Sequence, residues 1–190
     1  INEVSHGVGT SSCSRAGESV GFGYGRACQA VLDWKGAPLY WESALVFSRC
    51  ARVEGLVFVF PEACIGEEHE RVTGLMRDAP LGLPWKVVAG GALRQDSVRN
   101  GLSVLPDDCE EVLIHDAARP FVSPALVNRI LDGLHGETPG ERIAACIPGV
   151  PVVDTIKVMD EDGKVVATPD RKHLRAVQTP QGFSLAFLRA

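Results

Sequence analysis

Short apolar runs alternate with amphipathic segments along the chain from residue 31 onward. Four runs have the length of strands and are almost continuously apolar: residues 56–60, 86–88, 112–114 and 143–147. Such runs are typical of strands that are buried on both faces, as in a parallel sheet covered by helices. The pattern therefore predicts an α/β fold with a mostly parallel sheet flanked by helices.

Two segments between these strands place apolar residues at helical spacing. One runs from Asp96 to Leu105. The other covers residues 124–134, where Ser123 fits an N-cap, Pro124 fits the first turn and Gly136 fits a stop signal. We predict a helix in each segment.

The segment after residue 147 predicts a β-hairpin. Residues 150–159 and 164–168 are rich in Val, and they flank residues 160–163, whose Asp-Gly pair favours a tight turn. An isolated two-stranded hairpin is at best marginally stable in water. We therefore expect a protruding β-hairpin arm at about residues 148–172 that buries its apolar side chains against a second subunit, which makes the protein a homodimer.

Both ends of the chain depart from this pattern. Residues 184–190 read as the first turns of a helix without a stop signal, so the sequence is expected to continue past Ala190. Residues 1–30 hold only isolated apolar residues among Gly and Ser, so we expect no core strand there. The chain is interpreted as a single domain over residues 1–190, incomplete at its carboxyl terminus and irregular over 1–30.

Composition narrows the class of protein. With 45% hydrophobic and 23% charged residues and a net charge of −5, the 190 residues suit one folded domain. No apolar run approaches the roughly 18 residues of a membrane span, and no Lys/Arg cluster favours nucleic acid. The six cysteines form no CxxC pair, which predicts reduced thiols. We expect a cytoplasmic protein without membrane or nucleic-acid partners.

One candidate ligand loop follows the strand at residues 86–88, because ligands of open α/β sheets bind beyond the carboxyl ends of strands. Gly90 and Gly91 permit close approach of the backbone to a ligand, and Arg94 can bind an anion at the start of the helix that holds Asp96 and Ser97. A glycine turn with a capped helix and a solvated arginine fits the local pattern equally well.

A second candidate loop follows the strand at residues 112–114. Asp116 can hold Mg²⁺ against phosphate groups, and Arg119 can bind an anionic substrate, with two alanines between them leaving space. A structural salt bridge between the two is the alternative. His115 suggests a general base, but a histidine at a strand end is more often structural, and we favour that interpretation.

The predicted arm carries its own polar residues. In a strand, Asp154 and Ile156 would share one face, and Thr155 and Lys157 the other. Arg171 follows the second stretch. Charged residues on a hairpin are usually only solvated, so the local pattern by itself does not make them a site.

Four ordered motifs change this assessment: GGALRQDSVRNGL, HDAARPFVSP, VPVVDTIK and TPDRKHLRAVQTPQGF. Together with WKGAPLYW they closely resemble the 2-C-methyl-D-erythritol 4-phosphate cytidylyltransferase family over about residues 31–190. The resemblance implies a Rossmann-like nucleotidyltransferase fold with a dimerising β-arm. It also implies Mg²⁺-dependent transfer of a cytidylyl group from CTP to methylerythritol phosphate, giving 4-diphosphocytidyl-2-C-methyl-D-erythritol and pyrophosphate in non-mevalonate isoprenoid synthesis.

The resemblance also assigns roles to individual residues. Asp116 would lie beside the metal and both substrates, and Arg171 would reach from the arm of the other subunit to position the phosphate for attack. The residues expected to bind the sugar-alcohol phosphate are Arg119, Asp154 and Thr155. The residues expected to bind the nucleotide are Gly90, Gly91, Arg94, Asp96 and Ser97.

The amino-terminal segment departs from the family. The family opens with an apolar strand and a loop of the type LLAAGxGxRxGxxxPKQ, whose Arg and Lys stabilise the triphosphate. The lysine position falls here at Gln29 or Cys28, and the nearby arginines, Arg15 and Arg26, have a different spacing. Three explanations stay open: a catalytically impaired relative, an altered amino-terminal segment, or a sequence in which separate pieces are joined. The intact later motifs favour the last two.

Other functions are compatible with parts of the pattern. A ribitol 5-phosphate cytidylyltransferase would share most of the motifs, and a non-catalytic nucleotide-binding homologue would explain the missing lysine. Residues 20–25 contain a GxGxG that could suggest a nicotinamide-dependent oxidoreductase, but no strand precedes it and the spacing differs from the dinucleotide-binding fingerprint.

Overall fold

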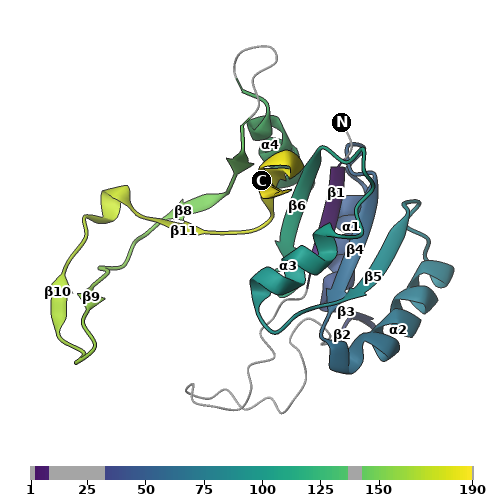
Figure 1. Ribbon diagram of the computed structural model, residues 1–190, viewed down its shortest axis with the longest axis horizontal. Helices are drawn as coiled ribbons and strands as arrows, with labels where there is room; N and C mark the ends of the chain where they lie inside the picture. Colours follow the sequence, from purple (N-terminus) through teal and green to yellow (C-terminus); the bar gives the residue numbers. More distant parts are fainter. Residues whose placement is uncertain (1–2, 9–32, 137–142, 190) are drawn as a thin grey trace.

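A six-stranded sheet forms the centre of the chain in the computed structural model, which describes residues 3–8, 33–136 and 143–189 (Figure 1). The first four strands in spatial order are mutually parallel, and the fifth runs antiparallel to both of its neighbours. The spatial order is β5 (Trp85–Ala89), β4 (Gly55–Phe60), β1 (Glu3–Val8), β6 (Glu111–Asp116), β12 (Gln181–Ser184) and β7 (Ala145–Cys146).

Helices cover both faces of this sheet. Along β4, Leu56, Phe58 and Phe60 pack into one apolar cluster, whereas Val57 and Val59 pack into the other, because successive side chains of a strand point to opposite faces. Residues of α1 (Leu39–Ser48), α2 (Ile65–Asp78) and α4 (Pro124–Leu134) join the first cluster. The second cluster includes side chains of α3 (Arg94–Leu102) and α5 (Leu185–Arg189). A short 3₁₀ helix, η2 (Glu62–Cys64), precedes α2.

The sequence pattern predicts most of this framework correctly. The apolar runs at 56–60, 86–88 and 112–114 are β4, β5 and β6, and the α/β class is confirmed. The predicted helix at 124–134 is α4, and Ser123 caps it by accepting a hydrogen bond from the Leu126 amide at 3.2 Å. The helix predicted from Asp96 is α3, although it ends at Leu102 and not at Leu105.

The expectation that residues 1–30 hold no core strand is wrong for residues 3–8. β1 lies between β4 and β6, with Val4 aligned to Gly55 on one side and to Val112 on the other. A strand paired along both edges obtains its backbone hydrogen bonds from its neighbours, so it does not require the continuous apolar run by which the other strands were recognised. Residues 9–32, including Arg15, Arg26 and Gln29, lie outside the described residues.

Residues 149–177 extend away from the sheet as two successive short ladders (Figure 1). Near the body, β8 (Gly149–Pro151) pairs with β11 (Arg175–Val177) in antiparallel fashion. Farther out, β9 (Val158–Met159) pairs with β10 (Val165–Ala167) around the predicted turn, where Gly163 has a φ of 77°. A 3₁₀ helix, η3 (Arg171–His173), lies between β10 and β11. We refer to residues 149–177 as the arm.

The first strand of the arm is shorter than predicted. Residues 152–157 are not in a strand, so the expected alternation of Asp154 and Ile156 against Thr155 and Lys157 is wrong. The Lys157 ammonium donates instead to the Thr168 hydroxyl at 2.8 Å, and Arg171 donates to the Val153 carbonyl at 2.7 Å. Side chains thus connect the two sides of the arm where the backbone ladder is interrupted.

A small hairpin precedes α1. It consists of β2 (Asp33–Trp34) and β3 (Ala37–Pro38), and Lys35 in its turn has a φ of 53°. The indole of Trp34 meets the ring of Phe121 edge to face, with centroids 6.4 Å apart. Within the described part of the chain, no helix has the length and apolar character needed to cross a membrane.

Candidate functional site

The two predicted ligand loops follow β5 and β6, which are separated in the sheet by β4 and β1 but end at the same edge. β4, β5 and β6 are parallel to β1 or to one another, so the loops that follow them leave the same edge of the sheet. The first loop is tied to this edge by the Gly90 amide, which donates to the Phe60 carbonyl at 2.7 Å. The site predicted from separate segments of sequence is therefore one continuous surface.

The two glycines of the first loop lie too close to α3 for any side chain. A Cβ on Gly91 would stand 2.3 Å from the Cβ of Asp96, and one on Gly90 would stand 2.8 Å from the Ser97 hydroxyl oxygen. Ser97 itself accepts a hydrogen bond from the Gly91 amide at 3.0 Å. Close approach of backbone to helix is the reason for glycine here, because neither residue has a positive φ.

The same loop is fixed by the first turn of α3. The Asp96 carboxylate accepts a hydrogen bond from the Leu93 amide at 3.2 Å, and the Ser97 hydroxyl lies 3.3 Å from the Leu93 carbonyl, to which it donates. Asp96 and Ser97 therefore shape the loop from within. The bond to Asp96 satisfies the Leu93 amide, which has no partner inside the helix at this end.

The carboxylate of Asp116 forms salt bridges with two arginines, one at the start of α3 and one in the loop after β6. Arg94 Nη2 lies 3.2 Å from Asp116 Oδ1, and Arg119 Nε lies 3.6 Å from Asp116 Oδ2. The side chains of all three are partly exposed, at 47% for Arg94, 31% for Asp116 and 45% for Arg119. The arrangement places two cationic groups and one carboxylate at a solvent-accessible edge, where they can engage an anionic ligand and a cation.

His115 has no access to this surface. The side chain is buried, and its ring packs against Phe47 with centroids 5.3 Å apart. Burial, which penalises the charged imidazolium, lowers the pKa of His115 to about 4. The interpretation of His115 as a structural residue therefore agrees with the geometry.

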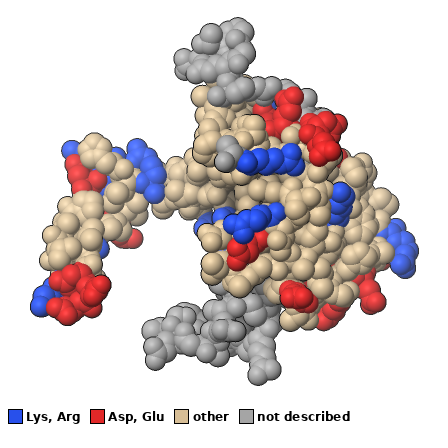
Figure 2. Space-filling model, in the orientation of Figure 1, with Lys and Arg blue, Asp and Glu red and all other residues tan. Residues whose placement is uncertain are grey.

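The predicted arm residues are not brought to Asp116 within the chain. Thr155 precedes β9, and Arg171 lies in η3, both on the part of the arm that extends away from the sheet in Figure 1. Arg171, Asp154 and Thr155 are exposed. Figure 2 shows several basic side chains with an acidic group among them on the part of the arm near η3, and mainly acidic side chains at its far end. The structure thus groups the sequence-predicted residues into two sets, one at the sheet edge and one on the arm.

Two residues just before β12 were not singled out by their local pattern. Gln178 accepts a hydrogen bond from the Arg119 guanidinium through its side-chain carbonyl. Thr179, which is buried, accepts one from the Asp116 amide at 3.3 Å. Both contacts span about sixty positions of sequence, so only the fold reveals them, although the QTPQGF motif that contains the two residues had been recognised.

No preformed cage for a metal ion is present among residues 3–8, 33–136 and 143–189, where no three His, Cys, Asp or Glu side chains cluster suitably. Asp116, at the carboxyl edge of the sheet, is the carboxylate that the sequence predicts to bind Mg²⁺. Mg²⁺ typically binds one or two carboxylates together with substrate phosphates and water, so a single exposed carboxylate next to an anion site fits that mode of binding.

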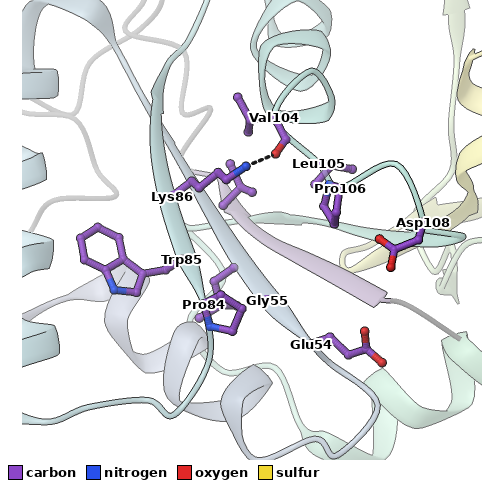
Figure 3. Close-up of a pocket in the computed structure, with 11 residues that line it drawn as sticks. Glu54, Gly55, Pro84, Trp85, Lys86, Val104, Leu105, Pro106 and Asp108 are labelled. Carbon is purple, nitrogen blue, oxygen red and sulfur yellow. Dashed lines mark hydrogen bonds between the residues drawn. The ribbon is translucent and has the colours of Figure 1, made fainter.

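A cavity of about 380 Å³ lies at the opposite edge of the sheet, where β4 and β5 begin. Figure 3 shows Glu54, Lys86 and Asp108 around it, with Lys86 donating to the Val104 carbonyl at 2.6 Å. None of the predicted site residues is among the described residues that line this cavity. This cavity is therefore separate from the predicted site.

Comparisons with known proteins show which family the chain resembles. The sequence model of IspD, 2-C-methyl-D-erythritol 4-phosphate cytidylyltransferase, matches residues 16–190. The bifunctional enzyme IspD/IspF of Oleidesulfovibrio alaskensis is 52% identical over 166 residues, covering 85% of this chain and 40% of the relative. The Rhodococcus jostii 2-C-methyl-D-erythritol 4-phosphate cytidylyltransferase is 38% identical over 174 residues, covering 92% of this chain and 70% of the relative. The chain thus spans about two fifths of the bifunctional relative.

Solved structures agree with the fold. The crystal structure of 2-C-methyl-D-erythritol 4-phosphate cytidylyltransferase from Thermus thermophilus matches with a TM-score of 0.61 and 31% identity, covering 85% of this chain and 68% of that one. A synthase structure from Anaerococcus prevotii matches with a TM-score of 0.75 at 21% identity, over 98% of this chain and 71% of that one, and supports the fold alone. Since the family pattern extends over most of the chain and the fold agrees, the chain belongs to the 2-C-methyl-D-erythritol 4-phosphate cytidylyltransferase family.

Proposed function

We propose that this chain is a cytidylyltransferase that joins CTP to 2-C-methyl-D-erythritol 4-phosphate and releases pyrophosphate. The observation that carries the proposal is the convergence of Arg94, Asp116 and Arg119 at the carboxyl edge of the sheet. Family membership supplies the substrate class, and the Rhodococcus jostii relative is a 2-C-methyl-D-erythritol 4-phosphate cytidylyltransferase by name. The ribitol 5-phosphate alternative is therefore not favoured.

The reaction makes modest demands on side chains. The nucleophile is a phosphate oxygen of the sugar alcohol, which is already anionic near neutral pH, so no general base is required. Catalysis then depends on holding two anions in line and on neutralising the charge that develops on the triphosphate. A pair of arginines beside a carboxylate suits this task, whereas the buried His115 does not contribute to it as a base.

The first loop is the proposed nucleotide site. Gly90 and Gly91 let the loop lie against α3, and Asp96 and Ser97 hold it in this shape through the hydrogen bonds described above, so that its backbone is fixed for contact with a base and ribose. Arg94, at the first position of α3, faces the triphosphate in this proposal. Asp116 would hold Mg²⁺, which supplies positive charge to the phosphates when bound.

Arg119 and the arm form the proposed site for the sugar-alcohol phosphate. Arg119 is held next to Asp116, whereas the arm, which carries Asp154, Thr155 and Arg171, extends away from the sheet in the same chain (Figure 1). The arm also exposes apolar side chains that a second surface would cover: Val153 at 78%, Met159 at 57% and Val166 at 60%. Both facts support a homodimer in which the arm of each subunit completes the site of the other.

The decisive experiment is an assay of pyrophosphate release. The chain would be incubated with CTP and Mg²⁺ together with either methylerythritol phosphate or ribitol phosphate. Activity with the first substrate alone supports the proposal. Turnover of ribitol phosphate at a higher rate would overturn the substrate assignment, and CTP binding without any turnover would support a non-catalytic homologue instead.

A further inference from the structure

Four residues form a closed set of hydrogen bonds beneath the Asp116–Arg119 loop. The Asp116 amide donates to the Thr179 hydroxyl at 3.3 Å. The same hydroxyl lies 3.2 Å from His115 Nδ1, and His115 Nε2 lies 3.0 Å from the Arg119 carbonyl oxygen. The Arg119 amide donates back to the Asp116 carbonyl at 2.9 Å. We call Asp116, Thr179, His115 and Arg119 the loop ring.

The direction of each hydrogen bond follows from the atoms involved. A carbonyl oxygen only accepts, so His115 Nε2 carries the proton that reaches Arg119. The Thr179 oxygen accepts from an amide, and its own proton is available for His115 Nδ1, which accepts it as the unprotonated nitrogen. Ser43 Oγ, 3.2 Å from Nε2, adds a second contact from α1. Donors and acceptors therefore match around the ring.

The two ends of the loop depend on this ring to different degrees. The backbone of Asp116 is also held in β6, where Asp116 pairs with Val8 of β1. Arg119 lies beyond the strand, and its backbone position is set by the ring while its guanidinium is held by Gln178, the neighbour of Thr179. Disturbing the ring should therefore displace Arg119 more than Asp116.

We propose that His115 is a positioning residue that, with Thr179, fixes Arg119 relative to Asp116 and so sets recognition of the phosphate on the sugar alcohol. The assignment to that substrate rests on the proposed function. His115 acts without touching a reacting atom, since its side chain is buried at 1% exposure and packed against Phe47. A fixed guanidinium matters because misplacing a charged group by about 1 Å can cost a hundredfold in rate.

The test uses pairs of variants that differ in one hydrogen-bonding group. Thr179→Val keeps the shape but removes the hydroxyl, whereas Thr179→Ser keeps it. We expect Thr179→Val and His115→Gln each to raise the KM for methylerythritol phosphate about tenfold, with the KM for CTP changed less than about twofold. Thr179→Ser should restore most of the lost affinity. Combining His115→Gln with Thr179→Val should be no worse than the worse single variant, because both break one ring.

Two readouts keep the positioning role separable from the proposed activity. Long-range nitrogen–proton NMR spectra of the wild-type histidine should show Nε2 protonated and Nδ1 unprotonated. Hydrogen exchange at the Arg119 amide should accelerate in Thr179→Val and return in Thr179→Ser. If the wild type lacks cytidylyltransferase activity, the proposed function fails. The two measurements still show whether the hydrogen bonds of the loop ring hold Arg119 in place. Protonation at Nδ1, unchanged exchange at Arg119, or equal effects on both KM values would overturn the inference.

Discussion

Arg94, at the start of α3, lies 3.2 Å from Asp116, at the end of β6, and this salt bridge joins the two loops of the site. Both side chains are partly exposed, so the pair contributes little to folding stability. Its consequence is positional, because it keeps a cationic group and a carboxylate together at the edge where CTP and a divalent cation are proposed to bind.

The first prediction concerns Arg94. Replacing it with Gln removes one charged contact to the triphosphate, and the Kd of CTP in the presence of Mg²⁺ should rise about tenfold, as expected for one charge-assisted hydrogen bond. Isothermal titration calorimetry measures the change. Arg99→Gln is the matched control: Arg99 lies on the same helix and pairs with Asp96 at 3.2 Å, but it is 74% exposed. An equal loss of CTP affinity in Arg94→Gln and Arg99→Gln would contradict the assignment of Arg94 to the triphosphate.

The second prediction concerns Gly91. Gly91→Ala places a Cβ 2.3 Å from the Cβ of Asp96, so the loop must move away from α3. We expect CTP binding to weaken at least about tenfold and the free energy of unfolding to fall by about 1–3 kcal/mol. In Gly74→Ala the new Cβ meets nothing within 4 Å, and this change within α2 should stabilise by roughly 0.5–1 kcal/mol. CTP titration and chemical denaturation test both; unaltered CTP affinity in Gly91→Ala would refute the close-approach argument.

Local sequence pattern predicts the parts of this fold that depend on local burial. β4 is recognisable because every one of its residues is buried, and α4 because Ser123 caps an amphipathic segment. α1 is harder to recognise, since Tyr40, Trp41, Ala44 and Phe47 leave no clear polar stripe. β1 is defined by its pairing on two sides, which no local pattern records.

The candidate site divides in the same way. The glycine loop and the Asp116–Arg119 loop could be predicted because each is a short motif at the end of a recognisable strand. The ion pair between Arg94 and Asp116 and the contact between His115 and Thr179 join residues 22 and 64 positions apart. Such contacts depend on strand order, and strand order here depends on where β1 and β12 insert. They therefore required the structure.

A third prediction concerns pH and the buried carboxyl of Glu68. Glu68 is 3% exposed and accepts a hydrogen bond from the Tyr40 hydroxyl at 3.0 Å. Burial raises the pKa of Glu68 above the value of 4.5 that it has in the unfolded chain, so the folded protein binds this proton more tightly. Its contribution to stability is therefore complete below pH 4.5 and declines as pH rises through the raised pKa.

Glu68→Gln should remove that decline. Relative to wild type, the variant should gain melting temperature progressively as pH rises from 4.5 towards neutrality, because the amide carries no charge and its oxygen still accepts from Tyr40. Thermal unfolding followed by circular dichroism over this range measures the difference. Glu70→Gln, which removes a carboxylate from the exposed side of the same helix, serves as the matched control. A constant offset between wild type and Glu68→Gln would disprove the assignment.

The last prediction tests whether the arm acts across subunits. Arg171→Ala should raise the KM for methylerythritol phosphate about tenfold or more and leave CTP binding nearly unchanged, because η3 is proposed to reach only the sugar-alcohol phosphate. Arg175→Ala is the control: like Arg171, Arg175 donates to backbone carbonyls of its own arm, but it is given no role in substrate binding. An equal loss of affinity for methylerythritol phosphate and for CTP in Arg171→Ala would count against this role.

Mixing two impaired variants, assayed at a low concentration of methylerythritol phosphate, separates the two possible arrangements of the arm. Arg119→Ala removes a residue from the sheet-edge set, and Arg171→Ala removes one from the arm set. If the arm completes the site of the partner, an exchanged mixture of the two variants contains mixed dimers with one intact site. With random exchange, about one quarter of all sites should regain activity. If each arm served its own subunit, every site would lack one arginine and the mixture would be as impaired as its components, so absence of recovery after confirmed exchange excludes the shared site.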